Sequence, residues 1–368
     1  MQRPASGRWL TAGHGVTATS GARTGQRRLG RVAAHIPIVC WDATGDSQQA
    51  PGEEAADIIP FAGSAGMGAE VVGLDLRACL FAGWGAGHES VDVLRSAVTA
   101  HGLLLFRGQL PRLSADELVD FSKWFGCGRL HSAHKNHHAA EHPDVFRVSN
   151  NPDFGCWEDN GVGSQGFHND GAFMPAPYSH AIYQIVEAPS LGGDTTFANI
   201  NKCLSDYIGD RGPEGADSAG FLSQLLTVND IASSLAFPIV HYHPYTARAL
   251  VLLNGFKRAL RRIPQEDGTE KMEELGKDDK ARVRQILRDV MEDSTGSHYI
   301  HRWLPGDVII TDNLAVAHRA AKQLQATSLS DGGGVRGAAG VAEHVPLRIL
   351  HRTTVLGTHM LGLVLDDE

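Results

Sequence analysis

Several patterns that define common protein classes are absent from this chain of 368 residues. The five cysteines are odd in number and scattered, and no two form a CxxC pair, which argues against a disulfide framework and against a zinc ribbon. No apolar run reaches the roughly 18 residues of a membrane-spanning helix. The formal net charge is -9, whereas phosphate binding needs a basic face. We therefore expect an intracellular protein with neither a membrane nor a nucleic-acid partner.

The first 41 residues differ in composition from the rest of the chain. They contain six arginines with many Ser, Thr, Gly and Ala, and the first acidic residue is Asp42. Arg-rich, acid-free segments are typical of mitochondrial and plastid transit peptides; without one, a cytoplasmic location is expected. A disordered tail and an over-extended reading frame are the alternatives. Residues 42–62 are polar and predicted to be a linker, which gives a leader with its linker at 1–60 and a single domain at 61–368.

Signals for strands outnumber those for helices in the predicted domain. Helices are predicted over 89–100, from Ser114 to Gly126 with Glu117 completing a capping box, and over 279–292. A short strand with its turn is predicted over 69–75, and strands are predicted over 103–106, 181–187, 194–198, 249–253, 307–311 and 348–355. Short strands between turn residues predict a barrel or a double-sheet jelly roll. The charged run 257–293 is predicted to be a solvated helical face, and the Gly-rich stretch 326–345 an inserted loop.

The sharpest chemical signal is the triplet His168-Asn169-Asp170. Residues two apart on a strand project to the same face, so a strand here would present an imidazole beside a carboxylate. A second triplet of this type, at 142–144, is the poorer candidate because its central proline removes a ladder donor. A second imidazole, from a histidine on a distant strand, would complete a set of two histidines and one carboxylate. Such a set leaves adjacent positions open on Fe(II) for oxygen chemistry.

Two further features accompany this triplet. Residues 192–195, with the sequence Gly-Gly-Asp-Thr, predict a tight turn before a strand, and Arg348 and Arg352 lie four apart on one predicted strand. Guanidinium groups suit the far carboxylate of an oxo-acid cosubstrate. Two histidines and a carboxylate also suit zinc, so a zinc-dependent hydrolase is one alternative and a non-catalytic jelly-roll binding protein is another. The arginine pair favours an oxygenase, because a hydrolase needs no oxo-acid clamp.

These residues belong to a longer series of landmarks with a fixed order. The series comprises 101–109, Phe125-Gly126, Val148-Ser149-Asn150, His168-Asn169-Asp170, 192–195, His243-Pro244 with Arg248, Pro305-Gly306-Asp307, Asp312-Asn313, His318, and Arg348 with Arg352. On this series the chain resembles the taurine dioxygenase family, TauD/TfdA, which also contains the aryloxyalkanoate dioxygenases. The resemblance extends from about Gly68 to Gly357. Phe167 departs from the usual Trp, and the gap between His318 and Arg348 is longer than usual.

The resemblance implies a mainly β fold with flanking helices around a double-stranded β-helix, the jelly-roll or cupin-like core. It implies that Fe(II) is held by His168, Asp170 and His318. It also implies that Thr195 and Arg348 bind the distal carboxylate of 2-oxoglutarate. The role that falls to Arg352 is to face the substrate pocket and meet an anionic group of the substrate.

The implied enzyme is an Fe(II)- and 2-oxoglutarate-dependent dioxygenase. It would hydroxylate a small organic substrate and release succinate and CO2, with O2 as the second cosubstrate and ascorbate as a supportive reductant. The presence of Asp170 favours hydroxylation over chlorination, because related halogenases need a small residue there. Arg352 favours a small-molecule substrate that carries a carboxylate or a sulfonate. Substrate identity and oligomeric state stay open, a homo-oligomer being one alternative.

Overall fold

The computed structural model describes residues 34–38, 54–62, 67–132, 137–151, 153–155, 166–190, 192–229, 231–268, 270–293, 295–321 and 346–365. Residues 1–33 of the predicted leader and the whole Gly-rich stretch 326–345 lie outside the described residues, so both interpretations stay predictions. In the described part of the chain, no helix is long and apolar enough to span a membrane.

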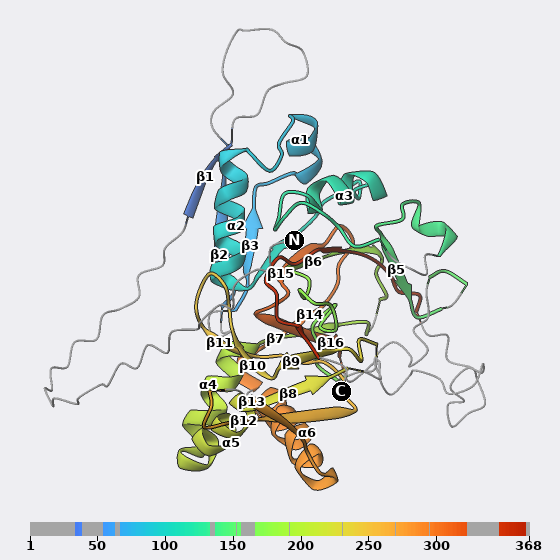
Figure 1. The fold of residues 1–368 in the computed structure, drawn as a ribbon. Coiled ribbons are helices and arrows are strands. Elements are labelled where there is room, and N and C mark those ends of the chain that lie inside the picture. The colour runs from blue at the N-terminus through green and yellow to red at the C-terminus, as the bar shows by residue number, and fades with distance from the viewer. Residues whose placement is uncertain are drawn as a thin grey trace, which may run out of the picture. The chain divides into compact units, whose positions relative to one another are not determined.

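An eight-stranded sheet is the largest β layer (Figure 1). Its strands, in spatial order, are β1 (Ala34–Ile38), β2 (Glu54–Pro60), β3 (Ala69–Val72), β4 (Leu103–Phe106), β15 (Val308–Asp312), β6 (His180–Glu187), β17 (Ile349–Val355) and β5 (Phe146–Ser149). Neighbours are antiparallel except β3 and β4, which are parallel. The sheet therefore places segments more than 100 residues apart in the sequence side by side.

Strand β2 occupies part of the segment that was predicted to be a linker. It pairs with β3 from Asp57 opposite Val72 to Pro60 opposite Ala69. Along it, Ala56 and Ile58 are buried whereas Asp57 and Ile59 are exposed. This alternation is the period-two pattern of a half-buried strand, which the acidic surroundings obscure in the sequence. The linker prediction therefore does not hold for residues 54–60.

Three helices pack against one face of the large sheet. They are α1 (Leu76–Phe81), α2 (Glu89–His101) and α3 (Ala115–Ser122). Alternation along β4 divides the buried residues between two cores: Leu104 and Phe106 join the cluster of these helices, whereas Leu103 and Leu105 join a cluster on the other face. The second cluster is the one that leads to the functional residues.

A three-stranded sheet packs on that other face. Its spatial order is β14 (His298–His301), β7 (Thr195–Asn199) and β16 (Val316–Ala320). Phe197 of β7 and Val316 of β16 share one buried cluster with Leu105, Tyr183 and Ile309 of the large sheet. The space between the two sheets therefore holds the side chains of β7, β16 and β17 that the sequence singled out.

The remaining elements lie beside this double layer. They are α4 (Ile200–Arg211), α5 (Pro213–Ser223) and α6 (Lys277–Glu292), the short 3-10 helices η1 (His138–Ala140) and η2 (Thr295–Ser297), a two-stranded sheet of β10 (Val240–Tyr242) and β11 (Ala249–Val251), and a five-stranded sheet with the order β13 (Glu270–Glu274), β12 (Arg258–Pro264), β8 (Leu225–Val228), β9 (Leu235–Pro238) and β18 (Leu363–Val364). Helices α4 and α5 were not predicted. The prediction of a helical face over 257–293 is wrong for its first part, where β12 and β13 form a hairpin.

A buried histidine in β10 makes the fold sensitive to acid. His241 is 5% exposed, and neither of its ring nitrogens hydrogen-bonds to a described residue. Burial, assisted by the nearby rings of His359 and His243, lowers the pKa of His241 from 6.5 to about 4. Between these two values the unfolded chain binds a proton that the folded chain does not. The free energy of unfolding therefore falls as the pH drops below 6.5, and this loss levels off near pH 4.

Replacement of this histidine should reduce the acid sensitivity. We expect His241→Leu to remove about 2 kcal/mol of the loss in unfolding free energy between about pH 7 and pH 5. Urea denaturation at each pH measures the difference. The same pH dependence in the variant and in the wild-type protein would contradict the assignment of a lowered pKa to His241.

Candidate metal centre

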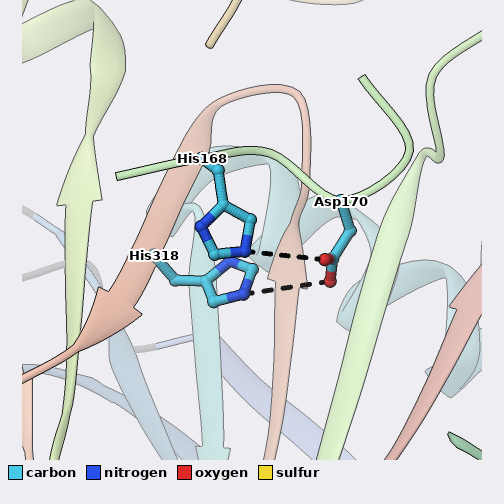
Figure 2. Close-up of side chains that lie close together, drawn as sticks. All are labelled: His168, Asp170 and His318. Atoms are coloured by element: carbon cyan, nitrogen blue, oxygen red, sulfur yellow. Dashed lines mark ion pairs between the residues drawn. The ribbon is translucent and has the colours of Figure 1, made fainter. Parts of the chain in front are cut away.

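Three side chains from two distant parts of the chain meet between the two sheets (Figure 2). His168 Nε2 lies 3.9 Å from Asp170 Oδ1, and His318 Nε2 lies 3.9 Å from Asp170 Oδ2. The candidate ligand atoms all lie within 4.8 Å of one another, and among the described residues no other group of three His, Cys, Asp or Glu side chains does so. The structure thus brings together the three residues that the sequence singled out as metal ligands.

Backbone hydrogen bonds hold the two histidines side by side. The amide of His168 donates to His318 O at 3.2 Å, and the amide of His318 donates to His168 O at 3.1 Å. The ring centroids are 4.4 Å apart. The triplet was predicted to lie on a strand, and this is wrong: His168 forms an isolated bridge to β16, and Asp170 lies in a turn. The side chains therefore converge through a bridge and a turn.

The side chain of Asn313 fixes that turn. Its Oδ1 accepts from Asp170 N at 3.0 Å, while its Nδ2 donates to Asp170 O at 2.9 Å and to Tyr178 O at 2.8 Å. Asn169 Nδ2 donates in return to Asn313 O at 2.7 Å. Asn313 is completely buried and directly follows β15. One amide side chain thereby joins the turn that bears Asp170 to the connection between β15 and β16.

The outer ring nitrogens of the two histidines also have partners. His168 Nδ1 lies 3.1 Å from the carbonyl oxygen of Gly166, which can only accept, so Nδ1 carries a proton and Nε2 is the nitrogen that faces Asp170. His318 Nδ1 lies 3.4 Å from the Tyr183 hydroxyl, which also lies 3.4 Å from Asp170 Oδ2. Contacts of this kind orient metal-binding histidines in proteins.

Electrostatics favour the protonation states that a divalent metal ion requires. Burial, assisted by His168 and Arg352, lowers the pKa of His318 from 6.5 to about 3, so its ring is neutral near pH 7. Burial alone would raise the pKa of Asp170. Arg352, the two histidines and the Tyr183 hydroxyl together outweigh burial and lower that pKa. The cluster therefore offers imidazole lone pairs and one carboxylate, a donor set that suits Fe(II) or zinc.

Arg352 of β17 contacts this cluster directly. Its Nη1 donates to Asp170 Oδ1 at 2.9 Å, and its guanidinium carbon lies 5.0 Å from the centre of the Phe146 ring. The side chain of Arg352 is 19% exposed, whereas that of Asp170 is 8% exposed. The positive charge of Arg352 therefore lies at the edge of the candidate metal site, where a ligand can reach it.

A second polar group lies deeper between the sheets. Arg348 donates from Nε to Gly193 O at 2.9 Å and from Nη2 to Thr195 Oγ1 at 3.4 Å. Arg348 is 5% exposed and forms no ion pair with any described residue. Burial lowers its pKa from 12.5 to about 10, although the carboxylate of Asp194 opposes this shift. A buried guanidinium without a paired carboxylate is the kind of site that an anionic group of a ligand would complete.

The competing triplet lies outside the cluster, in line with its prediction as the poorer candidate. The competing triplet places His142 and Asp144 elsewhere: Asp144 accepts from Ser132 Oγ at 2.6 Å, and neither residue belongs to the cluster. Trp303, for which no role was predicted, donates from its indole nitrogen to Thr195 Oγ1 at 3.0 Å. A Trp beside a Pro-Gly-Asp turn carries no local signal of this contact, because the partner lies 108 residues away.

Comparisons with known proteins identify relatives of this chain. A curated relative, the alpha-ketoglutarate-dependent sulfonate dioxygenase of Saccharomyces cerevisiae, is 26% identical over 62% of this chain, and the match covers 56% of the yeast protein, less than two thirds of its length. The (S)-phenoxypropionate/alpha-ketoglutarate-dioxygenase of Delftia acidovorans is 25% identical over 69% of this chain and 86% of its own length. Both relatives bear names of dioxygenases that use alpha-ketoglutarate, another name for 2-oxoglutarate.

Solved structures and a family model extend the comparison. A taurine dioxygenase from Burkholderia xenovorans has a similar fold, with a TM-score of 0.57 at 21% identity over 85% of this chain and 94% of that one. The model of the family described as taurine catabolism dioxygenase TauD, TfdA family matches residues 64–328, which include His168, Asp170 and His318. The chain belongs to the TauD/TfdA family of dioxygenases.

Proposed function

We propose that this protein is an Fe(II)- and 2-oxoglutarate-dependent dioxygenase that hydroxylates a small anionic organic molecule. The reaction consumes 2-oxoglutarate, O2 and one C–H bond of the substrate, and yields succinate, CO2 and the hydroxylated product. The observation that carries the proposal is the pairing of two sites: the cluster of His168, Asp170 and His318, and the buried Arg348 beside Thr195. The fold that we propose for the two facing sheets is the double-stranded β-helix, or jelly roll.

Each group has a separate task in this mechanism. His168, Asp170 and His318 would hold Fe(II), which supplies oxygen activation when bound. Arg348 and Thr195 would bind the distal carboxylate of 2-oxoglutarate, because a buried guanidinium without an ion-pair partner offers a charge-assisted hydrogen bond. The buried apolar cluster around Phe197 and the neighbouring strands excludes water from this end of the site.

Arg352 would position the substrate. Its guanidinium contacts the carboxylate of Asp170 and remains partly exposed, so an anionic substrate group that pairs with it would lie beside the metal site. The names of the two curated relatives include a sulfonate dioxygenase and a phenoxypropionate dioxygenase, and both substrates are anions. These observations support a sulfonate or carboxylate substrate for this chain as well. The proposed reaction also uses ascorbate as a reductant that keeps the iron ferrous.

A zinc-dependent hydrolase is the competing function, because the same three ligands suit zinc. The buried Arg348 argues against it, since hydrolysis at a zinc site requires no buried guanidinium beside a Thr hydroxyl. The presence of all three candidate metal ligands together with Thr195 and Arg348 also argues against a non-catalytic binding protein.

Turnover tests the proposal directly. We expect the purified protein, loaded anaerobically with Fe(II) and then supplied with O2, ascorbate and 2-oxoglutarate, to form succinate in amounts matched by a hydroxylated product. The substrates are a panel of alkyl sulfonates, aryl sulfonates and aryloxyalkanoates, each compared with its uncharged alcohol or amide analogue. Zn(II) loading is the matched control and should abolish succinate formation. Hydrolysis of an ester panel by the Zn(II) form, without succinate formation by the Fe(II) form, would contradict the dioxygenase.

A further inference from the structure

The hydroxyl of Thr195 has two recorded partners, and both are donors. Trp303 Nε1 lies 3.0 Å from Thr195 Oγ1, and Arg348 Nη2 lies 3.4 Å from the same oxygen. An indole nitrogen and a guanidinium nitrogen can donate but cannot accept. Thr195 Oγ1 therefore accepts in both hydrogen bonds, which occupies its lone pairs. The hydroxyl hydrogen of Thr195 must therefore point away from both Trp303 and Arg348.

Because these residues are buried, the direction of the hydrogen bonds at Thr195 affects which ligands can bind there. Trp303, Thr195 and Arg348 are 3%, 6% and 5% exposed, so bulk water competes little for their hydrogen-bonding groups. A hydroxyl whose lone pairs are both engaged can only donate to a further ligand. In a site that excludes water, such a donor aimed at a carboxylate discriminates strongly between ligands that have this group and ligands that lack it.

The ring of Trp303 is itself held in place. It packs edge to face on His301, with ring centroids 4.5 Å apart and planes at 84°. His301 Nε2 lies 3.1 Å from Asp307 Oδ2, which also accepts from the amide of Leu304 at 2.9 Å. Asp307 therefore binds both Leu304, the residue after Trp303, and His301, the ring on which the indole packs. The indole N–H is directed at Thr195 before any ligand arrives.

We propose that Trp303 is a positioning residue for the cosubstrate: its indole N–H fixes the Thr195 hydroxyl as a donor to the distal carboxylate of 2-oxoglutarate. This inference rests on the proposed function, because it concerns the same cosubstrate site. It assigns to Trp303 a selectivity for 2-oxo acids that carry a second carboxylate. A purely structural role would instead be to fill space in the core between the sheets.

Ligand binding without turnover separates these two roles. Isothermal titration calorimetry on the full-length Fe(II)-loaded protein under argon compares 2-oxoglutarate with 2-oxovalerate, which has the same five carbons and lacks only the distal carboxylate. We expect Trp303→Phe to weaken 2-oxoglutarate binding about tenfold and 2-oxovalerate binding less than about twofold. Trp124→Phe, the same change in the core beneath the helices, is the matched control and should alter neither affinity.

A double-mutant cycle tests whether Trp303 acts through Thr195. In a Thr195→Val protein, the further change Trp303→Phe should leave 2-oxoglutarate binding unchanged, because the hydroxyl that the indole orients is gone. Equal weakening of both ligands by Trp303→Phe would overturn the inference in favour of space filling, and so would additive effects in the cycle. Failure of the wild-type protein to bind 2-oxoglutarate would instead overturn the proposed function itself.

Discussion

Replacing Asp170 with alanine is expected to reduce succinate formation on the order of 1,000-fold or more and to lower the iron content of the purified protein. Asp170 is the only anionic member of the candidate metal cluster, and its oxygens face both imidazole Nε2 atoms at 3.9 Å. Without the carboxylate, two imidazole rings and the positive charge of Arg352 remain, which disfavours a divalent cation. Metal analysis after anaerobic loading and a succinate assay measure the two effects.

The second His-x-Asp triplet provides the matched control for this variant. Asp144 has the same spacing from His142 as Asp170 has from His168, but it pairs with Ser132 outside the cluster. Asp144→Ala should therefore retain both iron and turnover. If Asp170→Ala kept its iron and its activity, the cluster would not be the metal site, and the assignment of an oxygenase would lose its basis.

Removal of the buried guanidinium should have the second largest effect. We expect Arg348→Leu to weaken 2-oxoglutarate binding by about 3 kcal/mol, or on the order of 100-fold, because the distal carboxylate would lose its charged partner inside the protein. The Michaelis constant for 2-oxoglutarate should rise, while metal content stays unchanged. Arg348 makes no contact with His168, Asp170 or His318 through its recorded hydrogen bonds.

The conservative variant separates charge from geometry. Arg348→Lys keeps the charge but loses the planar fork that reaches both Gly193 and Thr195, so we expect an intermediate affinity. This variant also guards against a folding defect, since Arg348→Leu leaves the nearby Asp194 carboxylate without its compensating charge. Wild-type affinity for 2-oxoglutarate in a folded Arg348→Leu protein would show that its carboxylate binds elsewhere.

Sequence patterns only a few residues long correctly predicted strand β4 and the start of helix α3. The apolar run 103–106 is β4, with its predicted bounds, because a buried central strand needs no polar alternation. The predicted capping box of α3 is present: Ser114 Oγ accepts from Glu117 N at 3.2 Å, and Glu117 Oε2 accepts from Ser114 N at 2.6 Å. Both features are specified by four or five neighbouring residues, so the sequence alone predicts them.

Other elements were not predicted, either because tertiary packing stabilises them or because charged residues obscure their sequence pattern. Helix α5 contains Gly215 and Gly220, which disfavour an isolated helix, and Leu222 anchors it in the cluster of α4 and α6. The hairpin of β12 and β13 turns at Asp267-Gly268, with Gly268 at a φ of 81°. An Asp-Gly pair is a recognised hairpin signal, but the surrounding charged residues suggested a helix.

The candidate site was predictable in its residue types and not in its assembly. The spacing of His168 and Asp170 indicated a pair of ligands, yet the strand alternation assumed for them is absent. Their convergence requires the buried amide of Asn313, whose three contacts to the turn and its neighbour span more than 130 residues of sequence. No local pattern encodes such contacts, because they depend on which strands become neighbours.

The reciprocal backbone pairing of His168 with His318 has a thermodynamic consequence. Each residue uses its own peptide group to restrain the other, so the separation of the two main-chain segments that bear the imidazoles is fixed by backbone hydrogen bonds. An arriving ion then has little conformational entropy to remove from its ligands, and more of the coordination energy is retained as affinity. Metal binding at this cluster would therefore require little rearrangement of the backbone that carries the two histidines.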